Sequence, residues 1–202
     1  MHLPPDVAAY ARIEVLEEQR PLSDEEFFEF CQNNSEFHIE RDANGEITIM
    51  PPAGAETGDR SSELNFQLRG WAKRDGRGKA FDASTGFVLP DKAMLSPDAS
   101  WVLRSRIAGL SQGQKQRFLP LCPDFVVELI SPSDRLSKLM TKMTGWMANG
   151  AQLGWLIDPA RRTVYVYRPG KQPEQLTDVE RVSGEGPVEG FVLELQEIWQ
   201  GL

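Results

Sequence analysis

Two carboxylates in this sequence stand where neighbouring strands would bring them together. Asp98 follows a proline at the start of one expected strand, and Glu128 lies near the end of another, the apolar run FVVELI. If these strands are neighbours, both side chains meet at one edge of a sheet. Two converging carboxylates suit a hard divalent cation such as Mg²⁺, or Mn²⁺ in its place, which prefers oxygen ligands and retains several waters. Such a cation can activate water and stabilise a phosphoryl transition state.

A lysine follows on the helix expected after the Glu128 strand. Lys142 lies at the edge of the apolar stripe of that helix, and Lys138 lies one turn earlier on the same flank. Each residue also has a structural interpretation: Asp98 as an acid at a strand entry, and Lys142 as a solvated flank residue. Glu128 needs a partner, because an unpaired carboxylate among apolar neighbours is costly to desolvate. A salt bridge to a basic residue at position 135, 138 or 142 would also satisfy it.

Composition restricts the chemistry to carboxylates and lysines. The chain has 202 residues, of which 40% are hydrophobic and 26% are charged, as in an ordinary globular protein. It has only two histidines and two cysteines, too few for a disulfide scaffold or a four-cysteine zinc site. Neither a G-x-x-x-x-G-K-[ST] phosphate loop nor a G-x-S-x-G nucleophile elbow occurs.

The net charge of −8 counts against nucleic acid as a partner, because a negative surface repels phosphates. A local basic strip could outweigh this average. Its candidates are Arg60, Arg69, Lys73, Arg74, Arg77 and Lys79. No segment approaches the roughly 20 apolar residues that a membrane helix needs, and no signal peptide is apparent, so we expect a cytoplasmic protein without membrane contact.

The elements that must position these residues alternate between helix and strand. Ser23 and Glu26 form a capping box for a helix that ends near residues 33–34, and Asn44-Gly45 joins two alternating runs, 36–40 and 46–50, in a β-hairpin. Helical spacing predicts an amphipathic helix over 59–73. Strands are expected at 79–82, 86–89, 97–103, 125–130, 153–157 and 163–167, with weaker ones at 173–176 and 190–195.

Two further segments complete the expected architecture. Residues 104–119 are polar and predict a connection with at most one helical turn, and Ser133 is expected to cap a helix that runs through residue 147 to the stop at Asn149-Gly150. The pattern predicts an α/β protein of mixed α+β type, with one domain over residues 1–202 and its core at about 20–200. No linker or repeat divides it.

Several short motifs, in this order, resemble the Uma-type restriction endonuclease family. They are MPPAGAETG (50–58), TGF (85–87), SPDASWV (96–102), PDFVVEL (123–129), SPSDRL (131–136), KM (142–143) and LGWLIDP (153–159). The resemblance covers nearly the whole chain. It implies membership of the PD-(D/E)XK nuclease superfamily, and therefore a restriction-endonuclease-like core in which helices flank a central mixed sheet, with extra strands at both ends.

The resemblance also implies roles for particular residues. Asp98 is the acid of the PD element, and Glu128 is the acidic member of the second element, so both would bind metal. The superfamily pattern places a lysine two residues after that acid, where this chain has Ile130. Uma-type proteins similarly carry the lysine on the following helix, where Lys142 stands. Glu63 matches the acid that the first core helix often contributes, although it could equally be a charge on the helix face.

This sequence departs from the family pattern at the lysine and at a histidine position. Glu56, in the loop before the first core helix, could line the same cleft, and Thr57 stands where many members have histidine. The displaced lysine and the missing histidine favour an alternative, a nuclease-fold protein with a decayed site that binds a partner or nucleic acid without cutting it. Glycoside hydrolysis by two carboxylates is a third possibility, which only the two acids support.

The leading hypothesis is a metal-dependent DNA endonuclease that uses Asp98, Glu128, Lys142 and Glu63. With this net charge, DNA affinity should be weak, salt-sensitive and assisted by metal. Cutting both strands of a duplex would be simplest for a symmetric homodimer.

Overall fold

A computed structural model of the chain describes residues 22–202, and the first 21 residues of the expected domain lie outside this range. The helices are α1 (Asp24–Asn33), α2 (Ala55–Asp75), α3 (Arg104–Ala108), α4 (Gln112–Lys115), α5 (Leu136–Ala148) and α6 (Gln196–Gln200), with a 3-10 helix, η1, at Gly186–Val188. The strands are β1 (His38–Arg41), β2 (Ile47–Met50), β3 (Gly78–Asp82), β4 (Phe87–Val88), β5 (Met94–Leu95), β6 (Ala99–Leu103), β7 (Phe125–Leu129), β8 (Leu153–Asp158), β9 (Thr163–Tyr167), β10 (Glu174–Thr177), β11 (Arg181–Ser183) and β12 (Val192–Glu194).

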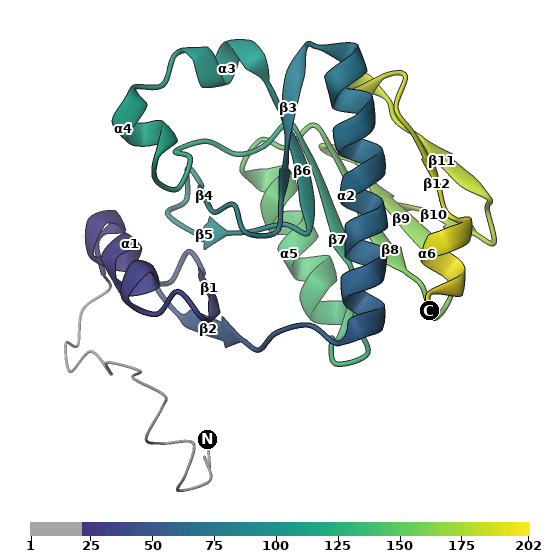
Figure 1. Ribbon diagram of the computed structural model, residues 1–202, viewed down its shortest axis with the longest axis horizontal. Helices are drawn as coiled ribbons and strands as arrows, with labels where there is room; N and C mark the ends of the chain where they lie inside the picture. The colour runs from purple at the N-terminus through teal and green to yellow at the C-terminus, as the bar shows by residue number, and fades with distance from the viewer. Residues whose placement is uncertain (1–21) are drawn as a thin grey trace, which may run out of the picture.

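A mixed sheet forms the centre of the fold, in the order β10-β9-β8-β7-β6-β3. Strands β7 and β8 are parallel and are joined through α5, whereas the other neighbours in this sheet are antiparallel. Helices α2 and α5 pack on opposite faces (Figure 1). This is the α/β architecture, with helices flanking a mixed sheet, that the sequence predicts.

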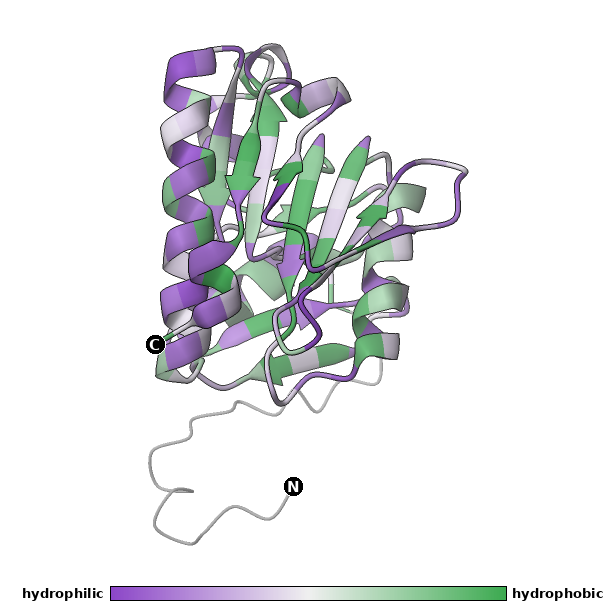
Figure 2. Cartoon of the chain, turned by 90° about the vertical axis from the view of Figure 1, so that its right-hand side faces the viewer, coloured by the Kyte–Doolittle hydropathy of each residue, from purple (hydrophilic) through white to green (hydrophobic). Residues whose placement is uncertain are grey.

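Alternation along the strands divides the core between the two faces. Trp101, Phe125 and Val127 face a cluster with α2, α6 and the β11-β12 hairpin, whereas Val102 and Val126 face a cluster with α5. Both faces are therefore apolar, as expected of strands buried on two sides. In Figure 2 the central strands are largely hydrophobic, while the long helix α2 mixes hydrophilic and hydrophobic residues.

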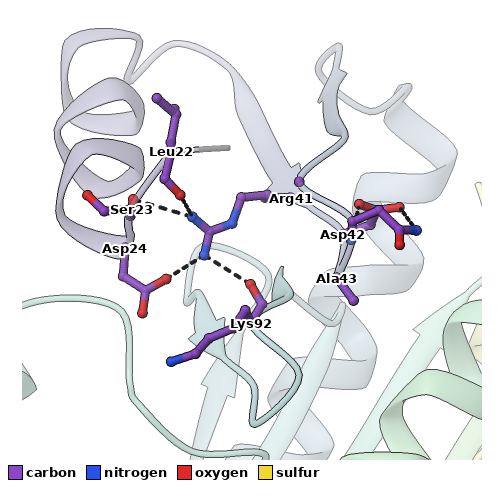
Figure 3. Close-up of a pocket in the computed structure, with 9 residues that line it drawn as sticks. Leu22, Ser23, Asp24, Arg41, Asp42, Ala43 and Lys92 are labelled. Carbon is purple, nitrogen blue, oxygen red and sulfur yellow. Dashed lines mark hydrogen bonds and ion pairs between the residues drawn. The ribbon is translucent and has the colours of Figure 1, made fainter. Parts of the chain in front are cut away.

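A second sheet, in the order β2-β1-β5-β4, carries the N-terminal hairpin and packs with α1. Arg41 fastens the hairpin to its neighbours (Figure 3). Its buried guanidinium donates to the carbonyls of Leu22, Ser23 and Lys92 and to the Asp24 carboxylate, and it lies 4.9 Å from the centre of a phenylalanine ring of α1. These contacts hold β1 against α1 and the turn before β5.

Local signals predict most of the central elements. The capping box at Ser23, the hairpin and the strands at 79–82, 125–130, 153–157 and 163–167 are confirmed within two residues at each end. The polar connection at 104–119 contains two short helices instead of at most one turn. Helix α2 begins at Ala55 instead of residue 59. Its N-terminal cap residue, Gly54, makes no side-chain capping bond, so no capping signal in the sequence marks this start.

The expected cap of α5 is wrong. Arg135, and not Ser133, is the N-terminal cap residue, and it makes no side-chain capping bond. The Asp134 carboxylate instead accepts the amide and hydroxyl of Ser131, and the Ser133 hydroxyl bonds to that of Ser131, so this segment forms a turn of its own. The short elements β5, β11, η1 and α6 also escaped prediction.

Within residues 22–202, no helix is both long and apolar enough to cross a membrane.

Candidate active site

Strand alternation places the two predicted carboxylates beside each other. Strands β6 and β7 are antiparallel neighbours with Ala99 opposite Val127, so Asp98 precedes β6 where Glu128 approaches the end of β7. The Asp98 carboxylate accepts the Leu129 amide at 2.6 Å from Oδ2. Glu128 points to the α5 side of the sheet, because its neighbours in β7 belong to the cluster on the other face.

Helix α5 brings a lysine and an indole to Glu128. Lys142 Nζ lies 3.0 Å from Glu128 Oε1 and 3.1 Å from Oε2, and Trp146 Nε1 donates to Oε1 at 2.9 Å. The two donors are four residues apart and therefore share one helix face. Lys142 is thus the lysine that reaches the carboxylate, whereas Lys138 is exposed one turn earlier.

A third carboxylate, from Glu40 of β1, completes the cluster, and no sequence pattern predicts it. Its Oε1 lies 2.9 Å from Lys142 Nζ and 2.8 Å from the Ser96 amide nitrogen, and the Ser96 carbonyl lies 3.3 Å from the same ammonium. His38 Nε2 is 3.9 Å from Glu40 Oε1. The contact with Lys142 spans 102 positions. A hairpin acid that alternates with Ile39 carries no local sign of such a partner.

The charged groups shift one another's pKa values. Burial raises the pKa of Glu128, and the nearby acids Asp98 and Glu40 reinforce it against the effect of Lys142, so that the pKa reaches about 8. Burial likewise raises the pKa of Asp98. Burial opposes ionisation of Glu40 too, but Lys142, His38 and the Ser96 amide lower its pKa to about 2.

The lysine stays charged in this environment. Burial disfavours its ammonium form, but the carboxylates of Glu128 and Glu40 outweigh that effect and raise the pKa of Lys142. One ammonium therefore faces the carboxyl groups of Asp98, Glu128 and Glu40, and the cluster carries excess negative charge when all of these are ionised. Strongly shifted carboxyl pKa values occur at functional sites and also in structural ion-pair networks, so the geometry must distinguish the two.

The donor set fits a cation that takes few protein ligands. Among the described residues, no group of three or more His, Cys, Asp or Glu side chains is arranged to hold a metal ion. Asp98 and Glu128 are the pair that the sequence predicts, and a metal held by them would share Glu128 with Lys142 and Trp146. Mg²⁺ is often bound through one or two carboxylates and keeps several waters, so this pair is compatible with it.

The two acids of the α2 region have contacts elsewhere. Glu63 accepts a hydrogen bond from Gln67, which also bonds to the backbone of β12, and Glu56 pairs with Arg60. The α2 residue that touches the Asp98 segment is Asn65, whose amide donates to the Asp98 carbonyl at 2.9 Å. The structure therefore brings together Asp98, Glu128 and Lys142, and the contacts of Glu63 lie on another side of α2.

A mixed central sheet with helices on both faces is the architecture of a restriction-endonuclease-like fold. Residues 24–196 match the family Uma2, described as "Putative restriction endonuclease", and the chain belongs to this family. A similar solved structure is that of "a putative nuclease belonging to DUF820" from Anabaena variabilis. It shares 23% sequence identity, covers 80% of this chain and 89% of its own, and superposes with a TM-score of 0.67, which supports the fold. Comparison with curated proteins finds no match.

Proposed function

We propose that this protein is a divalent-metal-dependent DNA endonuclease that hydrolyses phosphodiester bonds at Asp98, Glu128 and Lys142. The observation that carries the proposal is the reach of Lys142 from α5 to Glu128, at 3.0 Å, beside Asp98. Lys142 therefore supplies an ammonium group beside Asp98 and Glu128, although Ile130 occupies the position two residues after Glu128 where the superfamily usually has its lysine. Membership of a family described as restriction endonucleases supports the same chemistry.

The side chains have distinct roles in this proposal. Asp98 and Glu128 would hold Mg²⁺ or Mn²⁺, which when bound supplies an activated water and neutralises phosphoryl charge. Lys142 would orient the attacking water or stabilise charge that develops on the phosphate. Glu40 is a positioning residue, because its Oε1 lies 2.9 Å from the lysine ammonium that also contacts Glu128. Glu63 has no role that its contacts support.

Plasmid cleavage tests this proposal. The purified protein should nick or cut plasmid in Mg²⁺ or Mn²⁺, and Asp98→Ala should lower the rate by about 100-fold or more, as expected when charge stabilisation is lost. Asp82→Ala is a matched control, because Asp82 is an exposed acid on β3 and lies opposite Ala99, the residue after Asp98. Equal nicking by both variants would contradict the assignment of the site.

One observation favours the alternative of a nuclease-fold protein that binds without cutting. Both oxygens of Glu128 are already engaged, by Lys142 and by the Trp146 indole, so a metal must share them with these donors. Metal titration separates the alternatives. An active site should gain thermal stability in Mg²⁺ or Mn²⁺ and lose this gain in Glu128→Ala, whereas an inactive site should show neither change.

Oligomeric state bears on the type of cut. A symmetric homodimer would bring two such sites to opposite strands of a duplex. Sedimentation of the protein with and without duplex DNA tests this expectation, and a monomer that only nicks would contradict it.

A further inference from the structure

A pocket of about 420 Å³ lies between α1, the β1-β2 hairpin and β5. Its volume falls within the roughly 300–1,000 Å³ of small-molecule binding pockets. The lining comes from segments far apart in the sequence, including Gln32 of α1, Met50 of β2, Met94 of β5 and Phe118 after α4. The fold therefore assembles this pocket, and no single motif encodes it.

The pocket adjoins the charged cluster directly. His38 and Ser96 both line it, and both contact Glu40. The Ser96 carbonyl is also 3.3 Å from Lys142 Nζ. Only Ser96 would therefore separate a molecule in the pocket from the Lys142 ammonium that faces Glu128.

The walls suit a flat, uncharged group. Phe37 and Phe118 supply aromatic surface, and Pro51 and Pro52 supply flat apolar surface. Uncharged polar side chains line the pocket as well, namely Gln32, Ser35 and Ser84. Aromatic surface stacks with any nucleobase, and amide and hydroxyl groups can bond to base edges.

Charge argues against a phosphate in the same place. Among the described residues no lysine or arginine lines the pocket, whereas Glu36 does. An anion would lack a counter-charge here and would be repelled. The thiol of Cys31 also lines the pocket, and burial raises its pKa to about 12, so it contributes neutral surface instead of a reactive thiolate. The ammonium group that could bind a phosphate is that of Lys142, which contacts the pocket residue Ser96.

We propose that this pocket receives one unstacked base of the nucleic acid strand whose phosphate lies at the cluster of Asp98, Glu128 and Lys142. This inference rests on the proposed nuclease function and specifies its substrate. Taking a base out of a duplex costs a few kcal/mol, least for a strand that is already single or mismatched. The substrate is therefore single-stranded or locally unpaired next to the bond that is cut.

Binding of short strands in Ca²⁺, measured by fluorescence anisotropy, tests this inference. The probes are a fluorescein-labelled thymidine strand of about 12 nucleotides, its blunt duplex, and a strand of equal length built from abasic tetrahydrofuran phosphates. The thymidine strand should bind about tenfold tighter than the abasic strand, because stacking of one base contributes about 1–3 kcal/mol. It should also bind more tightly than the duplex.

A pocket-filling variant locates the effect. Ser35→Trp places a large side chain at an exposed lining position and should weaken binding of the thymidine strand about tenfold while leaving the abasic strand unchanged. Asn33→Trp is the matched control, because Asn33 is an exposed residue two positions away that does not line the pocket. It should bind both strands as the wild type does.

The outcomes distinguish this inference from the function on which it rests. Equal affinity for the thymidine and abasic strands, together with metal-dependent cutting of plasmid, would overturn the base pocket alone. Absence of binding to every strand would overturn the nuclease proposal and this inference with it. A change of oligomeric state in Ser35→Trp, without loss of strand affinity, would assign the pocket to a second copy of the chain and would also overturn it.

Discussion

The carboxyl groups of Asp98, Glu128 and Glu40 are chemically alike, yet they occupy different environments around one ammonium. Glu40 receives Lys142 and the Ser96 amide on the same oxygen, and its pKa is lowered to about 2. Glu128 is 3% exposed and faces two other acids, and its pKa is raised to about 8. The cluster therefore contains one carboxyl group that stays ionised and another whose charge depends on pH near neutrality.

The stability of the metal-free protein should depend on this difference. Between its usual pKa of 4.5 and about 8, folded Glu128 retains a proton that the unfolded chain has lost. Its stabilising contribution is complete below the lower value and disappears as the pH rises through the higher one. We expect the free energy of unfolding in EDTA to fall across this window by at most about 1.4 kcal/mol per pH unit, and to fall less in Glu128→Gln.

Urea unfolding at about pH 5.5 and pH 8.5 measures this change. Glu197→Gln is the control, because Glu197 is an exposed acid of α6 that lies outside the cluster. Glu40 works in the opposite sense, since its contribution is present above pH 4.5 and is lost as the pH falls toward 2. Parallel pH profiles for the wild type and Glu128→Gln would contradict the raised pKa.

At the scale of the element, α5 supplies the hydrogen-bond donors for the Glu128 carboxylate of β7. Lys142 and Trp146, four residues apart, both donate to Glu128, and Met143 between them is buried against the sheet. The apolar stripe fixes how the helix is rotated, and this rotation aims both donors at one carboxylate. A single helix thus supplies both the charge and the neutral hydrogen bond that a buried acid requires.

Removing the indole donor should be more costly than removing an equally buried indole without a partner. Trp146→Phe deletes the hydrogen bond to Glu128 and should lower the free energy of unfolding by about 1–3 kcal/mol more than Trp155→Phe. Trp155 is the matched control, because it is fully buried in the same fold and its Nε1 has no hydrogen-bond partner among the described residues. Equal losses in urea unfolding would show that the indole bond contributes little.

The N-terminal hairpin is the second element that builds the site, because it carries Glu40. Arg41, the next residue, anchors it through carbonyls and Asp24. Arg41→Lys cannot make this set of bonds and should destabilise the protein by about 3 kcal/mol. Asp24→Ala removes a partner whose side chain is 45% exposed and should cost about 1 kcal/mol or less.

Hydrogen exchange shows whether this anchor positions the hairpin locally. Arg41→Lys should accelerate exchange in peptides covering 37–50 more than in peptides of the central sheet, because local opening exposes the weaker unit first. Uniform acceleration throughout the chain would instead indicate that the hairpin and the central sheet unfold together.

At the scale of the whole molecule, local patterns predict the middle of the central sheet because β7 and β8 are largely apolar runs with clear stops. The same patterns bring Asp98 beside Glu128, since an antiparallel pairing of their strands is enough. They do not reveal Glu40 or the pocket at Phe37 and Phe118, because both depend on how the hairpin packs against distant segments. Weak capping signals explain the misplaced start of α2.

The distribution of basic residues also differs from the strip expected along α2. Arg60 is paired with Glu56 and Arg77 with Asp75, while Lys73 is exposed near the C-terminal end of α2. The C-terminal end of α2 leads into the start of β3, which pairs with the end of β6. Asp98 precedes the start of β6, so the five residues of that strand, about 16 Å, separate it from the end of α2. The C-terminal part of the strip is therefore distant from Asp98, whereas Arg69 lies one turn from Asn65, the residue that contacts the Asp98 carbonyl.

Exposed cations nearer the cluster lie at the start of α5. Arg135 and Lys138 precede Lys142 by two turns and one turn of chain. Both residues lie at the start of the helix that carries Lys142, whereas α2 packs on the other face of the central sheet. Electrostatic affinity for nucleic acid should therefore depend more on the start of α5 than on the end of α2, even though the molecule as a whole carries a charge of −8.

Charge reversal at both places tests this expectation with equal changes in net charge. Arg135→Glu with Lys138→Glu should reduce the slope of log K against log salt by about 1.4–1.8, as expected when two phosphate contacts are lost, whereas Lys73→Glu with Arg74→Glu should change it little. Acids in the first turn of α5 also suit the helix dipole, so the first variant should fold. Anisotropy titrations over a range of salt concentrations measure both slopes, and a larger loss in the α2 variant would place the strand across α2 instead of α5.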